Sequence, residues 1–130
     1  MRISLQSIRC YATTESDGDE IYCVVEPSGG ADEKLTRIEI GNFGVGTNLS
    51  ANKLLWNCKT GATIRFMEND ENEPEHGSDD FVGEIVVYTD ANCTTGHNTL
   101  DEGFDESKRY RQFSLQGSGA HYVVQLEIVT

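Results

Sequence analysis

The feature that most constrains the fold of this chain is the alternation of apolar and polar residues, which recurs in short segments along nearly its whole length. In the last segment, residues 121–129, Tyr122, Val124 and Leu126 fall on one face, whereas Gln125 falls on the other. A period of two is typical of a β-strand with one buried face. Because no segment keeps helical spacing of apolar residues for three turns, the sequence predicts an all-β fold.

Seven further segments have the same character and are bounded by Gly, Asn, Asp or Ser. They span residues 3–10, 20–26, 35–40, 53–57, 63–67, 81–88 and 110–115. In the first of them the apolar phase shifts after Leu5, which predicts a β-bulge near Ser7. Eight such strands predict an antiparallel eight-stranded β-sandwich, with a small closed barrel as the alternative. We expect one domain over residues 1–130, because no repeat or linker divides the chain.

The chain is strongly acidic, with 22 Asp and Glu residues against 10 Lys and Arg residues and a formal net charge of -12. This balance argues against nucleic acid as a partner and against unaided binding to an anionic membrane. It favours solubility, cation binding or a basic partner. Neither a signal peptide nor an apolar run of about 20 residues is visible, so we expect a soluble protein and leave its compartment open.

The four cysteines, Cys10, Cys23, Cys58 and Cys93, are widely spaced and form no CxxC pair. Zinc sites usually contain such close pairs, so the spacing argues against zinc. We expect free, buried thiols. Disulfides are the alternative for a secreted protein, and Cys10 and Cys23 would then be the first pair to test.

Two loops between predicted strands concentrate carboxylates. The first loop contributes Glu15, Asp17 and Asp19, and the second contributes Glu68, Asp70, Asp79 and Asp80. Loops of this kind can meet at one end of an antiparallel sandwich, where oxygen ligands from both would suit Ca²⁺. Two carboxylates about 4 Å apart repel by roughly 4 kcal/mol at an effective dielectric constant of about 20. Either a cation draws the loops together, or the loops stay apart in water.

The stretch FMENDENEPEHGSDDFVG (66–83) resembles the third calcium-binding loop of C2 domains. In that family an acid-x-Asp sequence ends one strand, and an Asp-apolar-apolar-Gly sequence opens the next. Residues 68–70 and 80–83 follow these two patterns. The first C2 loop ends in an Asp shortly before a Tyr, and the stretch SDGDEIYCVV is similar, with Asp19 and Tyr22 in those places.

The resemblance implies a C2-like sandwich that binds calcium between its first and third loops. The resemblance implies Asp19, Asp70 and Asp80 as the central ligands, and Glu68, Asp79, Asp17 and Glu15 as additional ligands. The chain departs from the family in having Glu68 in place of an Asp, a longer third loop and one extra residue before Tyr22. C2 domains often use calcium to dock on phospholipid, but scattered basic residues and acidic loop tips without apolar residues argue against that step here.

Catalytic motifs are missing from the sequence. It contains no G-x-S-x-G, P-loop or G-x-G-x-x-G pattern, and a surplus of loop carboxylates selects no glycosidase pair. We therefore predict a non-enzymatic module that binds calcium, and binds a carbohydrate or protein ligand through its acidic loop end. The alternative is an acidic carbohydrate-binding, protein-binding or toxin-associated sandwich without a specific metal.

Overall fold

The computed structural model describes residues 1–29, 35–69 and 79–130, which form ten β-strands and no helix. Sheet A contains β1 (Arg2–Ala12), β4 (Asn48–Asn57), β8 (Thr99–Asp105), β9 (Tyr110–Leu115) and β10 (His121–Val129). Sheet B contains β2 (Asp19–Pro27), β3 (Thr36–Phe43), β5 (Ala62–Glu68), β6 (Asp80–Val87) and β7 (Cys93–Thr95). The all-β prediction is confirmed.

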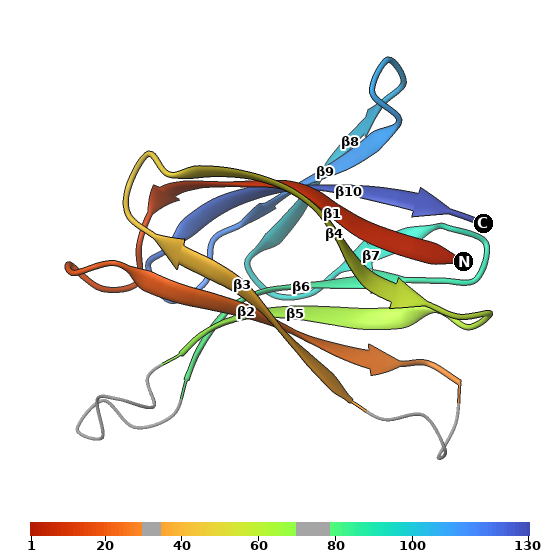
Figure 1. Ribbon diagram of the computed structural model, residues 1–130, viewed down its shortest axis with the longest axis horizontal. Coiled ribbons are helices and arrows are strands. Elements are labelled where there is room, and N and C mark those ends of the chain that lie inside the picture. Colours follow the sequence, from red (N-terminus) through yellow and green to blue (C-terminus); the bar gives the residue numbers. More distant parts are fainter. Residues whose placement is uncertain (30–34, 70–78) are drawn as a thin grey trace.

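The strand order is β4-β1-β10-β9-β8 in sheet A and β3-β2-β5-β6-β7 in sheet B, and all neighbouring pairs with a described register are antiparallel. The two sheets form a sandwich-like arrangement (Figure 1). The chain termini lie together at one end, and the connection from β1 to β2 lies at the other (Figure 1). In the parts of the chain that the structure describes, no helix is long and apolar enough to cross a membrane.

The core lies between the sheets and is built from the apolar positions of the alternating pattern. Its largest fully buried side chains include Tyr122 and Phe113 from sheet A and Phe66 from sheet B. Burial of these apolar surfaces is the main favourable term that holds two sheets face to face. The pairing of β1 with both of its neighbours shifts between Leu5 and Ser7, which confirms the predicted bulge.

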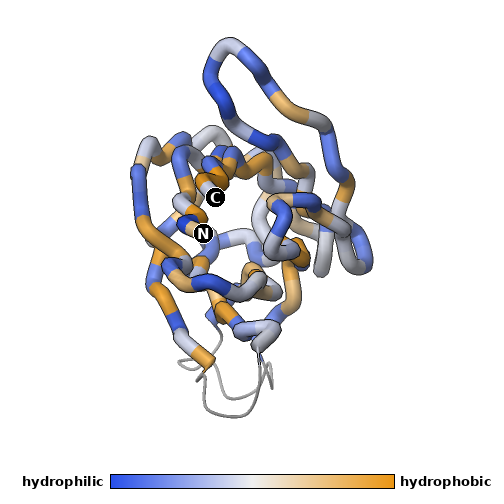
Figure 2. The backbone as a smooth tube through the Cα atoms, turned by 90° about the vertical axis from the view of Figure 1, so that its right-hand side faces the viewer, coloured by the Kyte–Doolittle hydropathy of each residue, from blue (hydrophilic) through white to orange (hydrophobic). Residues whose placement is uncertain are grey.

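The strand count differs from the prediction of eight because two strands carry no alternating pattern. β7 has only three residues, and β8 is exposed at every position after Thr99. β8 and β9 extend as a hairpin from the body of the sandwich, and this hairpin is mostly hydrophilic (Figure 2). β8 has no core beneath it and buries no side chain after Thr99, so its sequence lacks the period-two signal, whereas β9 buries Phe113 and Leu115.

All four cysteines are free, as expected. Cys10 and Cys23 are buried, whereas Cys58 and Cys93 are only partly buried. Burial raises the pKa of the Cys23 thiol, and it raises the pKa of the Cys93 thiol to about 11. The expectation of buried thiols therefore holds for two of the four.

Candidate metal centre

The end of the sandwich opposite the termini brings together the loop 13–18 and the ends of two strands of sheet B. Glu68 is the last residue of β5, and Asp80 is the first residue of β6. The two are direct partners in the β5–β6 ladder, and Glu68 pairs on its other side with Ile21 of β2. Because β2 follows the loop directly, the sheet register places this loop beside the two strand-end carboxylates.

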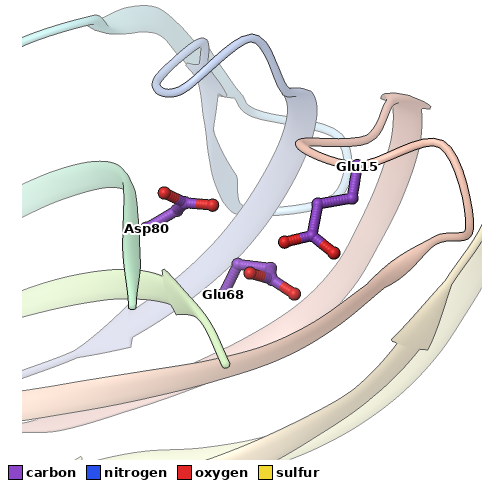
Figure 3. Close-up of side chains that lie close together, drawn as sticks. All are labelled: Glu15, Glu68 and Asp80. Atoms are coloured by element: carbon purple, nitrogen blue, oxygen red, sulfur yellow. The ribbon is translucent and has the colours of Figure 1, made fainter. Parts of the chain in front are cut away.

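Glu15, Glu68 and Asp80 converge at this end (Figure 3). One carboxylate oxygen from each lies within 4.8 Å of the others. Glu68 is buried, with only 2% of its surface exposed, and the other two are partly exposed. At such separations each pair of ionised carboxylates repels by about 3 kcal/mol at an effective dielectric constant of about 20. A bound cation would remove this cost.

A cavity of about 550 Å³ lies beside this group of three carboxylates. The first loop forms one wall, the turn between β3 and β4 forms another, and Glu68 and Asn69 at the end of β5 complete it. Asp17 lines the cavity and is itself exposed. Several oxygen-bearing side chains that the sequence analysis did not select also line it, namely those of Glu20, Asn42 and Asn69.

Asp19 has a different environment from the other carboxylates. It is 3% exposed, and both of its oxygens accept hydrogen bonds from the Thr14 amide, at 3.1 and 2.9 Å. The Thr14 hydroxyl donates to Oδ1 at 2.7 Å, and the Tyr122 hydroxyl donates to Oδ2 at 2.5 Å. These bonds tie the start of the first loop to β10. Asp19 is predicted as a central metal ligand, but it lies outside the group of three and anchors the loop.

The anchor continues into the core beneath the loop. Burial raises the pKa of the fully buried Tyr122 hydroxyl far above its ordinary value, and its hydrogen bond to the Asp19 carboxylate raises it further. Burial also raises the pKa of the Cys10 thiol, and the charge of Asp19 acts in the same direction. Tyr122 is therefore neutral at physiological pH and remains a donor to Asp19.

The conformation of the first loop depends on Gly18 and on Thr13. Gly18 has φ +102°, and a Cβ at this position would lie 2.9 Å from the Phe43 carbonyl oxygen. The Glu15 carbonyl accepts a hydrogen bond from the Thr13 hydroxyl at 2.5 Å and one from the Gly18 amide at 3.3 Å. These contacts fix the turn on which the Glu15 side chain is carried. A side chain at position 18 would be both strained and too close to β3.

Two further predicted ligands, Asp79 and Asp70, are not part of this group of three. Asp79 accepts a hydrogen bond from the Tyr22 hydroxyl. Asp70 lies outside the described residues. Asn69, just before it, is held to β2, because its amide donates to the Glu20 carbonyl at 2.9 Å and its side chain donates to the Glu20 carboxylate at 3.2 Å. Of the seven predicted site residues, the structure thus groups Glu15, Glu68 and Asp80.

Comparison with known proteins assigns no family to the chain: no protein-family model matches it, and no curated protein matches it in sequence. The interpretation of the site therefore depends on its own chemistry. Carboxylate oxygens are hard ligands, which suit Ca²⁺, Mg²⁺ or Mn²⁺ rather than metals that prefer sulfur or imidazole. The residues grouped here fit a divalent cation of this hard class.

Proposed function

We propose that this protein is a non-enzymatic calcium-binding module with a C2-like β-sandwich fold, and that it holds Ca²⁺ between its first acidic loop and the β5–β6 ladder. The observation that carries the proposal is the convergence of Glu15, Glu68 and Asp80 within 4.8 Å around a carboxylate that is only 2% exposed. Three carboxylates at this spacing, one of them buried, repel one another by an amount that is large beside a domain stability of about 5–15 kcal/mol, and a bound cation would offset that repulsion.

Calcium suits this arrangement better than magnesium does. Ca²⁺ accepts 6–8 oxygens in irregular geometry, whereas Mg²⁺ needs a near-ideal octahedron. Here one ligand comes from a loop and two from a strand ladder, so we propose the ion that tolerates irregular geometry. Glu15, Glu68 and Asp80 leave several coordination positions for water, for Asp17 or Asp70, or for an oxygen-bearing ligand.

The C2-like part of the proposal is supported by where the two acidic loops emerge. The loop between β1 and β2 and the strand ends that flank residues 69–79 lie at the same end of the sandwich, as the resemblance implies (Figure 1). The proposed ligand set differs from the set expected by resemblance. In the proposed set, Glu15 rather than Asp19 is the metal ligand from the first loop. Asp19 instead holds that loop in place through its hydrogen bonds with Thr14 and Tyr122.

In this proposal the loop end is already folded before calcium binds. The Asp19 anchor keeps the first loop in place without the ion, and the ion offsets the repulsion among the three carboxylates. The coordination positions that Glu15, Glu68 and Asp80 leave open would be available to an oxygen atom of a bound partner. The alternative, an acidic binding module without a specific metal, predicts that calcium has no effect on stability.

Thermal unfolding with calcium and with a chelator tests this proposal. A site with a Kd of about 10 µM should stabilise the protein by about 2.7 kcal/mol at about 1 mM free calcium. For a domain of this size the expected rise in Tm is several degrees. Glu68→Gln should abolish the rise, whereas Asp101→Asn, on the distant β8–β9 hairpin, should keep it. No rise at several millimolar calcium would overturn the proposal.

A further inference from the structure

A second hollow lies on the outer face of sheet A, toward the end with the termini. It is a groove of about 420 Å³, within the range of about 300–1,000 Å³ typical of small-molecule sites. Four adjacent strands contribute to it: Arg2, Ser4 and Gln6 from β1, Asn52 and Leu54 from β4, Tyr110 from β9 and Glu127 from β10. We propose that this groove binds a neutral oligosaccharide, a function beyond the calcium site.

The backbone of the two strands at the floor of the groove, β1 and β10, is already hydrogen-bonded within the sheet. β1 and β10 are interior strands of sheet A, and each is paired on both sides along this region. A peptide that recognises a sheet by adding a strand needs an unpaired edge, which these two strands lack. Recognition at the floor of the groove must therefore use side chains.

The polar side chains of the groove are balanced in charge, in a chain whose net charge is -12. The Arg2 guanidinium lies 4.0 Å from the Glu127 carboxylate, and the Gln6 amide donates to the Asn52 side-chain oxygen at 3.1 Å. An anion would meet Glu127, and a cation would meet Arg2. A ligand with many hydroxyls, each able to donate and accept, can use the carboxylate, the guanidinium and both amides.

Two apolar side chains flank this polar floor. Leu54 is 49% exposed on β4, and Tyr110 lies across the sheet on β9. A sugar ring has C–H faces that pack on aromatic and aliphatic surfaces, while its hydroxyls reach polar groups at the ring edge. The groove combines these two kinds of contact within one hollow, which is the usual composition of a small-ligand site.

The polar floor continues along the same face of sheet A. Gln125 of β10 donates to the Gln112 side-chain oxygen at 3.1 Å and accepts from the Ser7 hydroxyl at 2.9 Å. Farther along, the rings of Tyr11 and His121 stack with their centroids 5.0 Å apart. A row of amides and hydroxyls with aromatic groups toward both ends suits an extended chain of sugars better than a single one.

Native affinity electrophoresis tests the proposal, with gels that contain a mixed-linkage β-glucan, an arabinoxylan or a galactomannan as neutral probes and alginate as an anionic one. At least one neutral polysaccharide should retard the protein, equally with calcium and with chelator. Tyr110→Ala should weaken the retardation at least about fivefold. Arg2→Ala, a change at an exposed side chain that should not affect folding, should weaken it in the same direction.

Two variants serve as controls. Tyr88→Ala removes an exposed tyrosine outside the groove and should leave the retardation unchanged. Glu68→Gln removes the proposed calcium site and should also leave the retardation unchanged. Failure of the oligosaccharide proposal can therefore be distinguished from failure of the calcium proposal. The inference is overturned if no neutral polysaccharide retards the protein, if alginate alone does, or if Tyr110→Ala and Arg2→Ala have no effect.

Discussion

The two hollows of this protein are similar in size, at about 550 and about 420 Å³, but they differ in the charges of the side chains around them. At the loop end, Glu15, Glu68 and Asp80 converge with the same sign. On the outer face of sheet A, the charges of Arg2 and Glu127 are opposite and balance each other. Carboxylates that the fold brings together repel one another, and a bound cation would reduce this repulsion. A pair of opposite charges needs no such ion.

The loop end is also tied to the protein interior, whereas the groove is not. Beneath the first loop, Asp19 connects Thr14 to the buried Tyr122, so the position of the loop depends on a hydrogen-bonded group in the interior. The groove is built from outward-facing side chains on paired strands, and Arg2 is exposed over 56% of its side chain. Changes to the loop end should therefore affect stability strongly, and changes to the groove should affect mainly binding.

Asp19→Ala should give the largest effect and should lower the free energy of unfolding by about 3 kcal/mol. The change removes charge-assisted hydrogen bonds and leaves the Tyr122 hydroxyl buried without its acceptor. It should also abolish stabilisation by calcium while leaving polysaccharide binding intact. Urea unfolding measures the loss, and Asp17→Ala, at an exposed position, should change stability by less than about 0.5 kcal/mol. A loss below about 1 kcal/mol for Asp19→Ala would show that the anchor has little role.

Alkaline pH should destabilise the protein by about 2 kcal/mol between about pH 9 and about pH 10. The folded-state pKa values of Cys10 and Cys23 are raised by burial. The unfolded chain then loses these protons first as the pH rises, so the stability present below about pH 9 falls above it, by up to about 1.4 kcal/mol per pH unit for each group.

Urea unfolding across this pH range measures the effect. Cys10→Ala should flatten the decline, because it removes the thiol that lies under the loop end near Asp19. The groove contains neither thiol, so Arg2→Ala should leave the slope unchanged. Constant stability up to about pH 10 would contradict the buried environment assigned to these thiols.

The smallest predicted effects differ in sign between the two hollows. In chelator, Glu68→Gln should raise the free energy of unfolding by about 1 kcal/mol, because it removes one charge from three that repel. Glu127→Gln should lower it by less than about 0.5 kcal/mol, because it removes one partner of a loose surface pair at 4.0 Å. The urea midpoints of Glu68→Gln and Glu127→Gln, measured in chelator, show the sign of each change in stability. If both variants lose stability, the carboxylates at the loop end are not in net repulsion.

The sequence by itself determined the fold class and much of the strand placement. The period-two pattern marks the strands that bury a face, and the phase shift after Leu5 marks the bulge that the pairing of β1 contains. It missed β7 and β8, and it placed the start of β4 at residue 53 rather than at Asn48. Those segments bury little surface, so their sequences lack the apolar alternation on which the predictions depend.

The acidic loops were visible in the sequence, but the role of each carboxylate was not. Asp19 and Glu68 are both buried acids at strand ends, yet one is held by Thr14 and Tyr122 and the other lies in the group of three. Tyr122 is 103 residues from Asp19 along the chain, so no local pattern connects them. The groove likewise draws its side chains from four strands. Alternation is local and readable from neighbouring residues, whereas strand order and register decide which distant side chains meet.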